Sequence, residues 1–141
     1  MTVYLDTSNL VKLYIKEDDS AQIRQLVESA DVVVSSAIAY AEARATFARL
    51  QRMRQMTAEA MRRATDQLNA DWARFVIVPA NIDLIRGAGE LAETHALSGC
   101  DAIHLASLET LLVRVDDDDV EFSCADERLV KAARSLGQFV T

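Results

Sequence analysis

Short apolar runs alternate with long amphipathic segments along the whole chain, and this order strongly limits the folds available. The runs cover 2–5, 31–35, 75–78 and 120–124. Between them, apolar residues recur at helical spacing. Strands that alternate with helices pair in parallel, through right-handed crossovers. We therefore predict a three-layer α/β/α fold around a central, mostly parallel sheet of four or five strands, with 139–140 as the candidate fifth strand. The expected helices are 7–17, 20–29, 37–53, 57–72, 81–95, 100–114 and 126–136, the last ended by Gly137.

The length of the chain predicts a single domain. Its 141 residues fall within the usual size of one domain, and we find no linker and no internal repeat. We therefore expect one domain over 1–141. The helix pair 37–73 is the longest excursion from the sheet, and we expect it to project as an arm.

Several classes of protein are excluded by simple sequence features. No apolar run reaches the ~18 residues that a membrane span requires. The N-terminus has no basic region and meets an acid at position 6, unlike a signal peptide. Two cysteines, Cys100 and Cys124, make no disulfide framework. We expect a cytoplasmic protein with no membrane association.

The charge of the chain is acidic but unevenly distributed. It has 22 Asp and Glu against 15 Lys and Arg, a net charge of −7, whereas nucleic-acid binders are usually basic. The balance argues against broad binding of phosphate backbones unless the acids gather in a site that holds cations. Residues 43–58 contain no acid but include Arg44, Arg49 and Arg52. The four aspartates at 116–119 are typical of a solvated surface.

Four acids lie just after predicted strands or near the start of predicted helices. Asp6 ends the first strand, Glu42 lies in the helix after the second, Asp101 opens a helix, and Asp126 follows the last strand. In parallel α/β sheets, ligands bind at the carboxyl ends of the strands. We therefore expect these four carboxylates to meet at one edge of the sheet.

Helix capping is the alternative interpretation of the same acids. Asp6 and Asp126 suit N-caps, and Ser98 with Asp101 fits a capping box. However, Asp101 and Glu42 share helix faces with apolar residues, where an unpaired acid is costly. No Lys or Arg other than Arg44 is adjacent in sequence to neutralise them. An all-oxygen ligand set without a local cation points to Mg²⁺ or Mn²⁺.

These motifs, taken in order, resemble those of PIN-domain ribonucleases, and most closely the VapC-type toxins of bacterial toxin–antitoxin pairs. The matching segments are 3–8 with Asp6, Ser36 with Glu42 and Arg44, 101–106 with Asp101, and 125–129 with Asp126. The resemblance implies a PIN-like fold, a Mg²⁺ or Mn²⁺ site formed by the four acids, and endonucleolytic cleavage of RNA. It also implies a homodimer and a small antitoxin partner. A Ser or Thr often lies two residues before the last acid in the family, and here that position is Cys124 beside Ser123.

The chemistry is consistent with the residues themselves. Hydrolysis of a phosphodiester needs an activated water and stabilisation of negative charge, both of which Mg²⁺ supplies. We assign the central metal-ligand role to Asp6 and Asp101. Thr7 or Ser8 could donate to a phosphate at the start of a helix. Arg44 and Arg52 are candidate contacts to RNA phosphates, and equally to an antitoxin.

Other functional classes remain as alternatives. An aspartyl-phosphate phosphatase would present a second acid two residues after Asp6, and Ser8 stands there. A receiver-type switch would need a lysine facing its aspartate, and Lys131 is poorly placed for that. A catalytically inactive PIN-like domain that binds protein or RNA partners is the main alternative, but it leaves the acids on apolar faces unexplained.

The remaining conspicuous residues have ordinary structural interpretations. We expect His104 to be a hydrogen-bonded core histidine, and the two cysteines to be small core residues. A second apolar stripe on the 37–53 helix suits either a partner surface or packing against the 57–73 helix. Its residues are Tyr40, Phe47, Leu50 and Met53.

Overall fold

The computed structural model describes residues 1–137 and contains a four-stranded, fully parallel sheet. The strand order is β3-β2-β1-β4, so β1 is an inner strand that pairs with β2 on one side and with β4 on the other. The predicted sheet is confirmed, while the candidate strand at 139–140 lies outside the described residues. The strands are β1 (Thr2–Leu5), β2 (Val32–Ser36), β3 (Val76–Val78) and β4 (Val120–Ser123).

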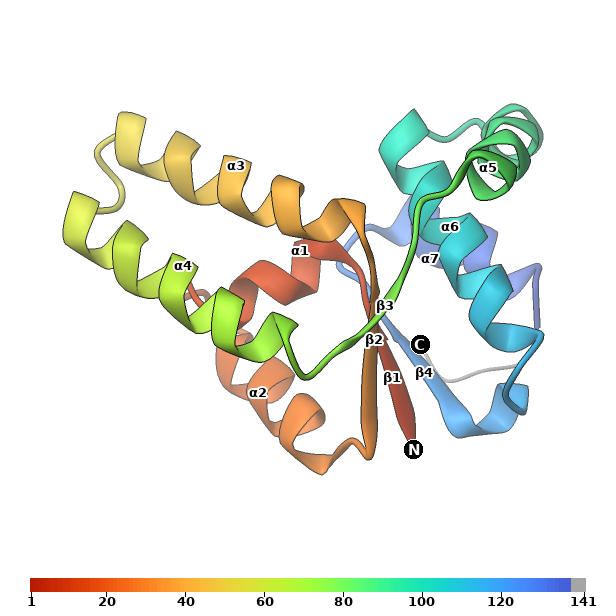
Figure 1. Ribbon diagram of the computed structural model, residues 1–141, viewed down its shortest axis with the longest axis horizontal. Coiled ribbons are helices and arrows are strands. Elements are labelled where there is room, and N and C mark those ends of the chain that lie inside the picture. The colour runs from red at the N-terminus through yellow and green to blue at the C-terminus, as the bar shows by residue number, and fades with distance from the viewer. Residues whose placement is uncertain (138–141) are drawn as a thin grey trace.

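Helices cover both faces of this sheet, which gives the predicted three layers (Figure 1). Helices α1 to α4 lie on one side, and α5, α6 and α7 lie on the other. The α-helices are α1 (Thr7–Leu10), α2 (Ser20–Ser29), α3 (Ile38–Arg52), α4 (Ala58–Trp72), α5 (Ile82–His95), α6 (Gly99–Leu112) and α7 (Glu127–Arg134), with short 3₁₀ turns at Val11–Leu13 and Asp117–Asp119.

The two-residue period of β1 divides the core into two clusters. Val3 and Leu5 point into the cluster beneath α1 to α4, whereas Tyr4 points into the cluster beneath α5 to α7. All three side chains are fully buried. The central strand is thus apolar on both faces, as expected of a strand in a covered parallel sheet.

Helices α3 and α4 form an antiparallel hairpin that extends sideways from the sheet (Figure 1). Phe47 is fully buried in the cluster with Leu68 of α4, and the Tyr40 ring lies 5.5 Å from that of Trp72. Met53, by contrast, is 56% exposed. Packing between the two helices therefore accounts for most of the apolar stripe on α3, rather than a partner surface.

Several predicted boundaries and environments are wrong. The expected helix over 7–17 is α1 followed by a 3₁₀ turn that ends at Leu13. Strand β2 is buried only toward its end, since Val32 is 39% exposed. Gly137 does not terminate α7, which ends at Arg134 in right-handed backbone, and no glycine in the described chain has positive φ. A side chain at position 137 would instead collide with Asp117.

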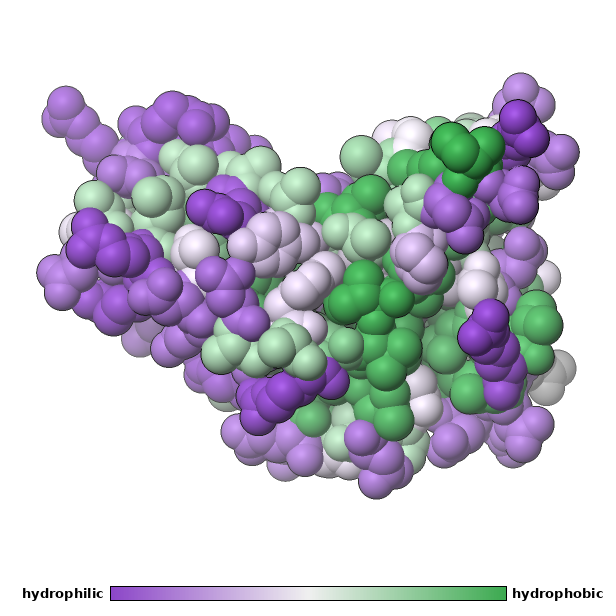
Figure 2. Space-filling model, viewed as in Figure 1, coloured by the Kyte–Doolittle hydropathy of each residue, from purple (hydrophilic) through white to green (hydrophobic). Residues whose placement is uncertain are grey.

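None of the helices in residues 1–137 is both long and apolar enough to cross a membrane. The space-filling view is notched between the α3–α4 pair and the α5–α6 pair (Figure 2). Glu42 of α3 and His104 of α6 meet between these two groups of helices, with Oε1 and Nε2 2.9 Å apart.

Candidate active site

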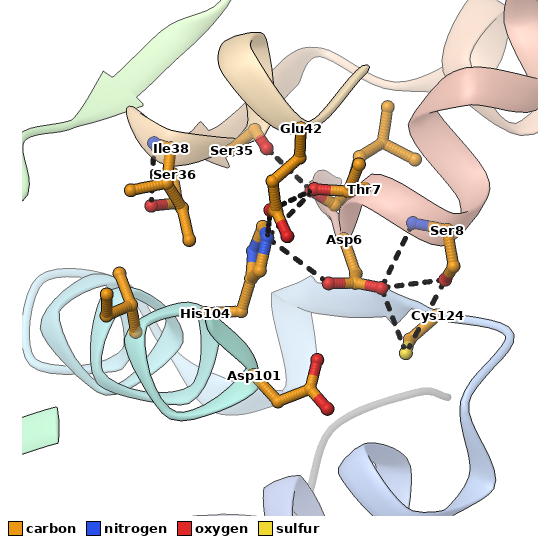
Figure 3. A network of polar contacts seen from close by, with 12 residues as sticks. Asp6, Thr7, Ser8, Ser35, Ser36, Ile38, Glu42, Asp101, His104 and Cys124 are labelled. Carbon is orange, nitrogen blue, oxygen red and sulfur yellow. Dashed lines mark hydrogen bonds and ion pairs between the residues drawn. The ribbon is translucent and has the colours of Figure 1, made fainter. Parts of the chain in front are cut away.

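Asp6 is the residue at which β1 becomes α1, and its carboxylate is almost fully buried. It caps α1 by accepting a hydrogen bond from the Ser8 amide, and Ser8 Oγ donates to Asp6 Oδ2 at 2.7 Å. The predicted capping role is therefore real. It occupies only one face of the carboxylate, because Oδ1 points instead toward His104 (Figure 3).

His104, which lies on α6, contacts three other residues of the site: Asp6, Thr7 and Glu42. Its Nε2 lies 2.9 Å from Glu42 Oε1 and 3.4 Å from Asp6 Oδ1. Thr7 Oγ1 also donates to Glu42 Oε1, at 2.7 Å. The prediction of a buried, hydrogen-bonded histidine is confirmed, but its position between two of the site acids was not anticipated.

The far side of the imidazole ring faces a buried hydroxyl group. The Tyr4 hydroxyl oxygen lies 3.0 Å from His104 Nδ1, and both side chains are fully buried. With the carboxylates at Nε2, both ring nitrogens have polar partners.

The carboxylates around His104 favour its charged form. Although burial opposes the charge, the Glu42 hydrogen bond and the Asp6 charge raise the pKa of His104. Burial likewise opposes the charge on Glu42, but bonds from His104 and Thr7 lower the pKa of that carboxyl. No Lys or Arg of residues 1–137 takes this role; instead the fold brings in His104 from another helix.

Asp101 and Asp126 face the open side of the site. Burial, followed by the charges of Asp6 and Asp126, raises the pKa of Asp101. Asp126 caps α7 by accepting hydrogen bonds from the amides of Arg128 and Leu129, and it is exposed. No Lys or Arg in residues 1–137 pairs with either carboxylate. The predicted proximity of Asp101 to Asp6 and Asp126 therefore leaves like charges facing one another.

Cys124 supplies a hydrogen-bond donor to the buried carboxylate of Asp6. Its thiol donates to Asp6 Oδ2 at 3.4 Å, while the Asp126 amide donates to the sulfur at 3.3 Å. Burial and the Asp6 charge raise the pKa of Cys124 to about 12, so the thiol stays protonated and remains a donor. Cys100, by contrast, is exposed, so its predicted place in the core is wrong.

The predicted substrate-binding residues fall into two groups. Thr7 and Ser8 lie inside the network just described. Arg44 is exposed and points away from it, with its guanidinium 3.3 Å from the Tyr40 hydroxyl and 5.7 Å from the centre of that ring. Arg52 lies in the last turn of α3, near the tip of the hairpin.

The carboxylates are suitable ligands for a divalent cation, but they do not form a ready-made cage. In residues 1–137, no three His, Cys, Asp or Glu side chains lie close enough together to hold a metal ion as they stand. Their oxygen donors and the like charges around Asp101 fit Mg²⁺ or Mn²⁺. Binding an ion therefore requires the side chains to rearrange.

Sequence reasoning missed Tyr4 and the contact between His104 and the acids. One signal was available, because His104 lies three residues after Asp101 and so shares its helix face. No sequence pattern around Tyr4 indicated a role in the site, because a tyrosine is common in a buried strand. Its hydroxyl meets His104 only because β1 and α6 pack together.

Comparison with known proteins agrees with this geometry. The PIN domain family model matches residues 3–135. Ribonucleases VapC45 and VapC49, from two strains of Mycobacterium tuberculosis, are each 34% identical over 135 residues, covering 96% of this chain and 91% of theirs.

Solved structures show the same fold. The crystal structure of Mycobacterium tuberculosis VapC20, a sarcin-ricin loop cleaving toxin, superposes with a TM-score of 0.69 at 19% identity, over 92% of this chain and 94% of that one. FitAcB from Neisseria gonorrhoeae gives 0.63 at 16% identity, over 95% and 94%. With a family model spanning nearly the whole chain and carboxylates at the ends of parallel strands, this chain belongs to the PIN domain family.

Proposed function

We propose that this chain is a divalent-metal-dependent endoribonuclease and the toxin of a toxin–antitoxin pair. The observation that carries the proposal is the unpaired acidic side of the site, where Asp101 lies near Asp6 and Asp126 with no Lys or Arg beside them. The similarity to VapC ribonucleases supports RNA as the substrate.

Mg²⁺, or Mn²⁺ in its place, would be held by Asp6, Asp101 and Asp126, with Glu42 completing the site. When bound, such an ion activates water and stabilises negative charge on a phosphate. The ion would also reduce the repulsion on the open side, because its positive charge neutralises carboxylates that otherwise repel one another. The donor set contains no second imidazole, which favours these hard cations over Zn²⁺.

The chain's own residues hold this arrangement in place. His104 positions the Glu42 carboxylate through Nε2, and Thr7 fixes the same oxygen from α1. Ser8 and Cys124 both donate to Asp6 Oδ2, which orients the buried carboxylate. Thr7 and Ser8 also remain candidates to contact a phosphate, and Arg44 and Arg52 to contact RNA farther along the arm.

The direct test is cleavage of RNA by the purified protein, freed of any bound partner. We expect cleavage of a structured RNA in Mg²⁺ or Mn²⁺, and its loss in EDTA. Asp101→Asn should abolish it, whereas Asp66→Asn on the exposed surface of α4 serves as the matched control. Cleavage that continues in EDTA would overturn the metal requirement, and a protein that cuts none of a panel of cellular RNAs would overturn the function.

The same proposal includes a small antitoxin partner, a homodimer and a cytoplasmic location. A short reading frame immediately upstream, whose product binds the protein and stops cleavage, would support the antitoxin. Sedimentation at micromolar concentration would distinguish a dimer from a monomer, and fractionation of cells would test the location.

A further inference from the structure

Helix α7 presents a row of cations on its exposed face, close to the acid cluster. Arg128, Lys131 and Arg134 recur every three residues and are exposed, while Leu129, Ala132 and Ala133 are buried beneath them. This spacing places the three cations along one side of the helix. Glu127 is the only acid within the helix, so α7 is locally basic in a chain whose net charge is −7.

Two open hollows flank this helix, and both are lined by Arg128 and Lys131. The first, about 560 Å³, begins at Cys124 and runs along α7 to Arg134. The second, about 520 Å³, lies between α7 and the end of α5 near His95. Because the Cys124 thiol donates to Asp6, the first hollow starts beside the acid cluster.

Arg128 and Lys131 are available to an external anion. Within residues 1–137, neither Arg128 nor Lys131 forms an ion pair, whereas Lys12, Arg63 and Arg74 each pair with an acid. Asp126, the site aspartate that precedes α7, accepts hydrogen bonds from the amides of Arg128 and Leu129 rather than from a side-chain cation of the helix. Arg128 and Lys131 therefore attract an anion to the surface beside the acidic centre.

We infer that α7 carries the phosphate backbone of the RNA on one side of the bond to be cut, with Arg128 and Lys131 as the phosphate-binding residues. This inference rests on the proposed endoribonuclease function. Among residues 1–137, the lining of the hollows contains no Phe, Tyr or Trp for bases to stack on, which favours contact with phosphate and sugar over recognition of bases. The same described lining has none of the large aromatic anchors that usually dominate protein–protein interfaces.

The test compares two double variants with the same loss of charge. Arg128→Gln with Lys131→Gln removes the row, and Arg24→Gln with Arg62→Gln removes two exposed, unpaired cations from α2 and α4. We would measure binding of a labelled 20-nucleotide oligouridylate by anisotropy at several salt concentrations, in EDTA. We would also measure single-turnover cleavage in Mg²⁺ of an RNA that the parent cuts.

For the α7 variant we expect the slope of log affinity against log salt to fall by about 1.4, since each single-strand phosphate contact contributes ~0.7. We expect the RNA concentration for half-maximal cleavage to rise about tenfold. The maximal cleavage rate should fall by a smaller factor. The control variant should show neither change. If the double variant fails to fold, Arg128→Gln and Lys131→Gln singly should each lower the slope by about 0.7.

The outcomes separate the two proposals. If the parent cuts RNA and both double variants behave alike, the α7 inference is overturned while the function stands. If the α7 variant keeps its RNA slope but loses binding of a protein partner, α7 is a protein-docking surface and the inference is again overturned. If the parent cuts no RNA, the function itself fails.

Discussion

The two sides of the acid cluster differ in how their negative charge is balanced. On the inner side, Glu42 and Asp6 face His104, whose charged form they favour, and hydroxyl groups complete their hydrogen bonds. On the outer side, no Lys or Arg of residues 1–137 pairs with Asp101 or Asp126, and the pKa of Asp101 is raised by burial and by the charges of Asp6 and Asp126. The fold therefore supplies a balancing group on one side, while like charges face one another on the other.

This difference shows how a single site can be both preorganised and ready to bind. The inner side holds its carboxylates in fixed orientations before any ion arrives, which limits the ordering needed on binding. The outer side retains unfavourable repulsion that an ion relieves. Four changes would test the contrast, beginning with the one of largest expected effect.

His104→Leu should lower the free energy of unfolding by about 3 kcal/mol, because removing one partner of a buried ion pair leaves the other uncompensated. The substitution also removes the partner of the buried Tyr4 hydroxyl. Denaturant unfolding, monitored by the fluorescence of Trp72, measures the change. His95→Leu replaces the other histidine, which is only half-buried on α5, and should change stability by less than about 0.5 kcal/mol. Equal effects at the two positions would contradict the ion pair.

Mg²⁺ at a hundredfold excess over its Kd should stabilise the parent by about 2.7 kcal/mol. Asp101→Asn removes a carboxylate from the outer side and should lose most of that gain, as measured by thermal unfolding with and without Mg²⁺. Asp118→Asn, in the exposed run of aspartates, should keep the full gain. A Mg²⁺ shift that is absent from the parent, or unchanged in Asp101→Asn, would place the ion elsewhere.

Without metal, neutralising one acid on each side should change the free energy of unfolding in opposite directions. Glu42→Gln weakens the pairing of His104 and should lower the free energy of unfolding by about 1 kcal/mol. Asp101→Asn relieves repulsion and should raise it by about 0.5 kcal/mol, a small value because this side chain is only partly buried and solvent screens its charge.

The free energies of unfolding of the two variants and of the parent, measured in EDTA, give this comparison. The Asn substitution leaves the backbone amide of residue 101 in place. This amide donates to Ser98 Oγ, so the cap of α6 is retained. If both substitutions are destabilising, the carboxylates do not repel one another, and helix capping alone explains them.

Cys124→Ser should change stability by less than about 0.5 kcal/mol, because the hydroxyl replaces the thiol as donor to Asp6. Cys124→Ala removes the donor and should lower the free energy of unfolding by about 1 kcal/mol. Rates of RNA cleavage should follow the same order, with Ser close to the parent. An Ala variant as active as the Ser variant would show that orienting Asp6 needs no donor here.

The alternation of strands and helices was sufficient to predict the parallel sheet and its three layers. Local signals also located the acids, since each follows a strand or opens a helix. The interpretation of capping and the interpretation of convergence were not exclusive, because Asp6 and Asp126 cap helices while remaining in the cluster. A carboxylate has two oxygens, and capping can leave other lone pairs for a second role.

Other features were decided by contacts between distant segments. The ends of α1 and α7 were misplaced because local apolar spacing continues past the point where tertiary packing stops the helix. Cys100 was misplaced because its burial depends on where the first turn of α6 lies relative to the surface. No sequence pattern near Glu42 indicates that a histidine 62 residues later will neutralise it.

By itself, the sequence determined the fold class, the order of the elements and the set of acids at the strand ends, because these depend on local periodicity and on the handedness of crossovers. Only the tertiary structure decided which acids are neutralised and which are left open. That depends on how α6 lies against β1 and α3, which brings His104 into contact with Tyr4 and with Glu42. Charge balance acts through space over a few ångströms, and the chain order alone does not contain those distances.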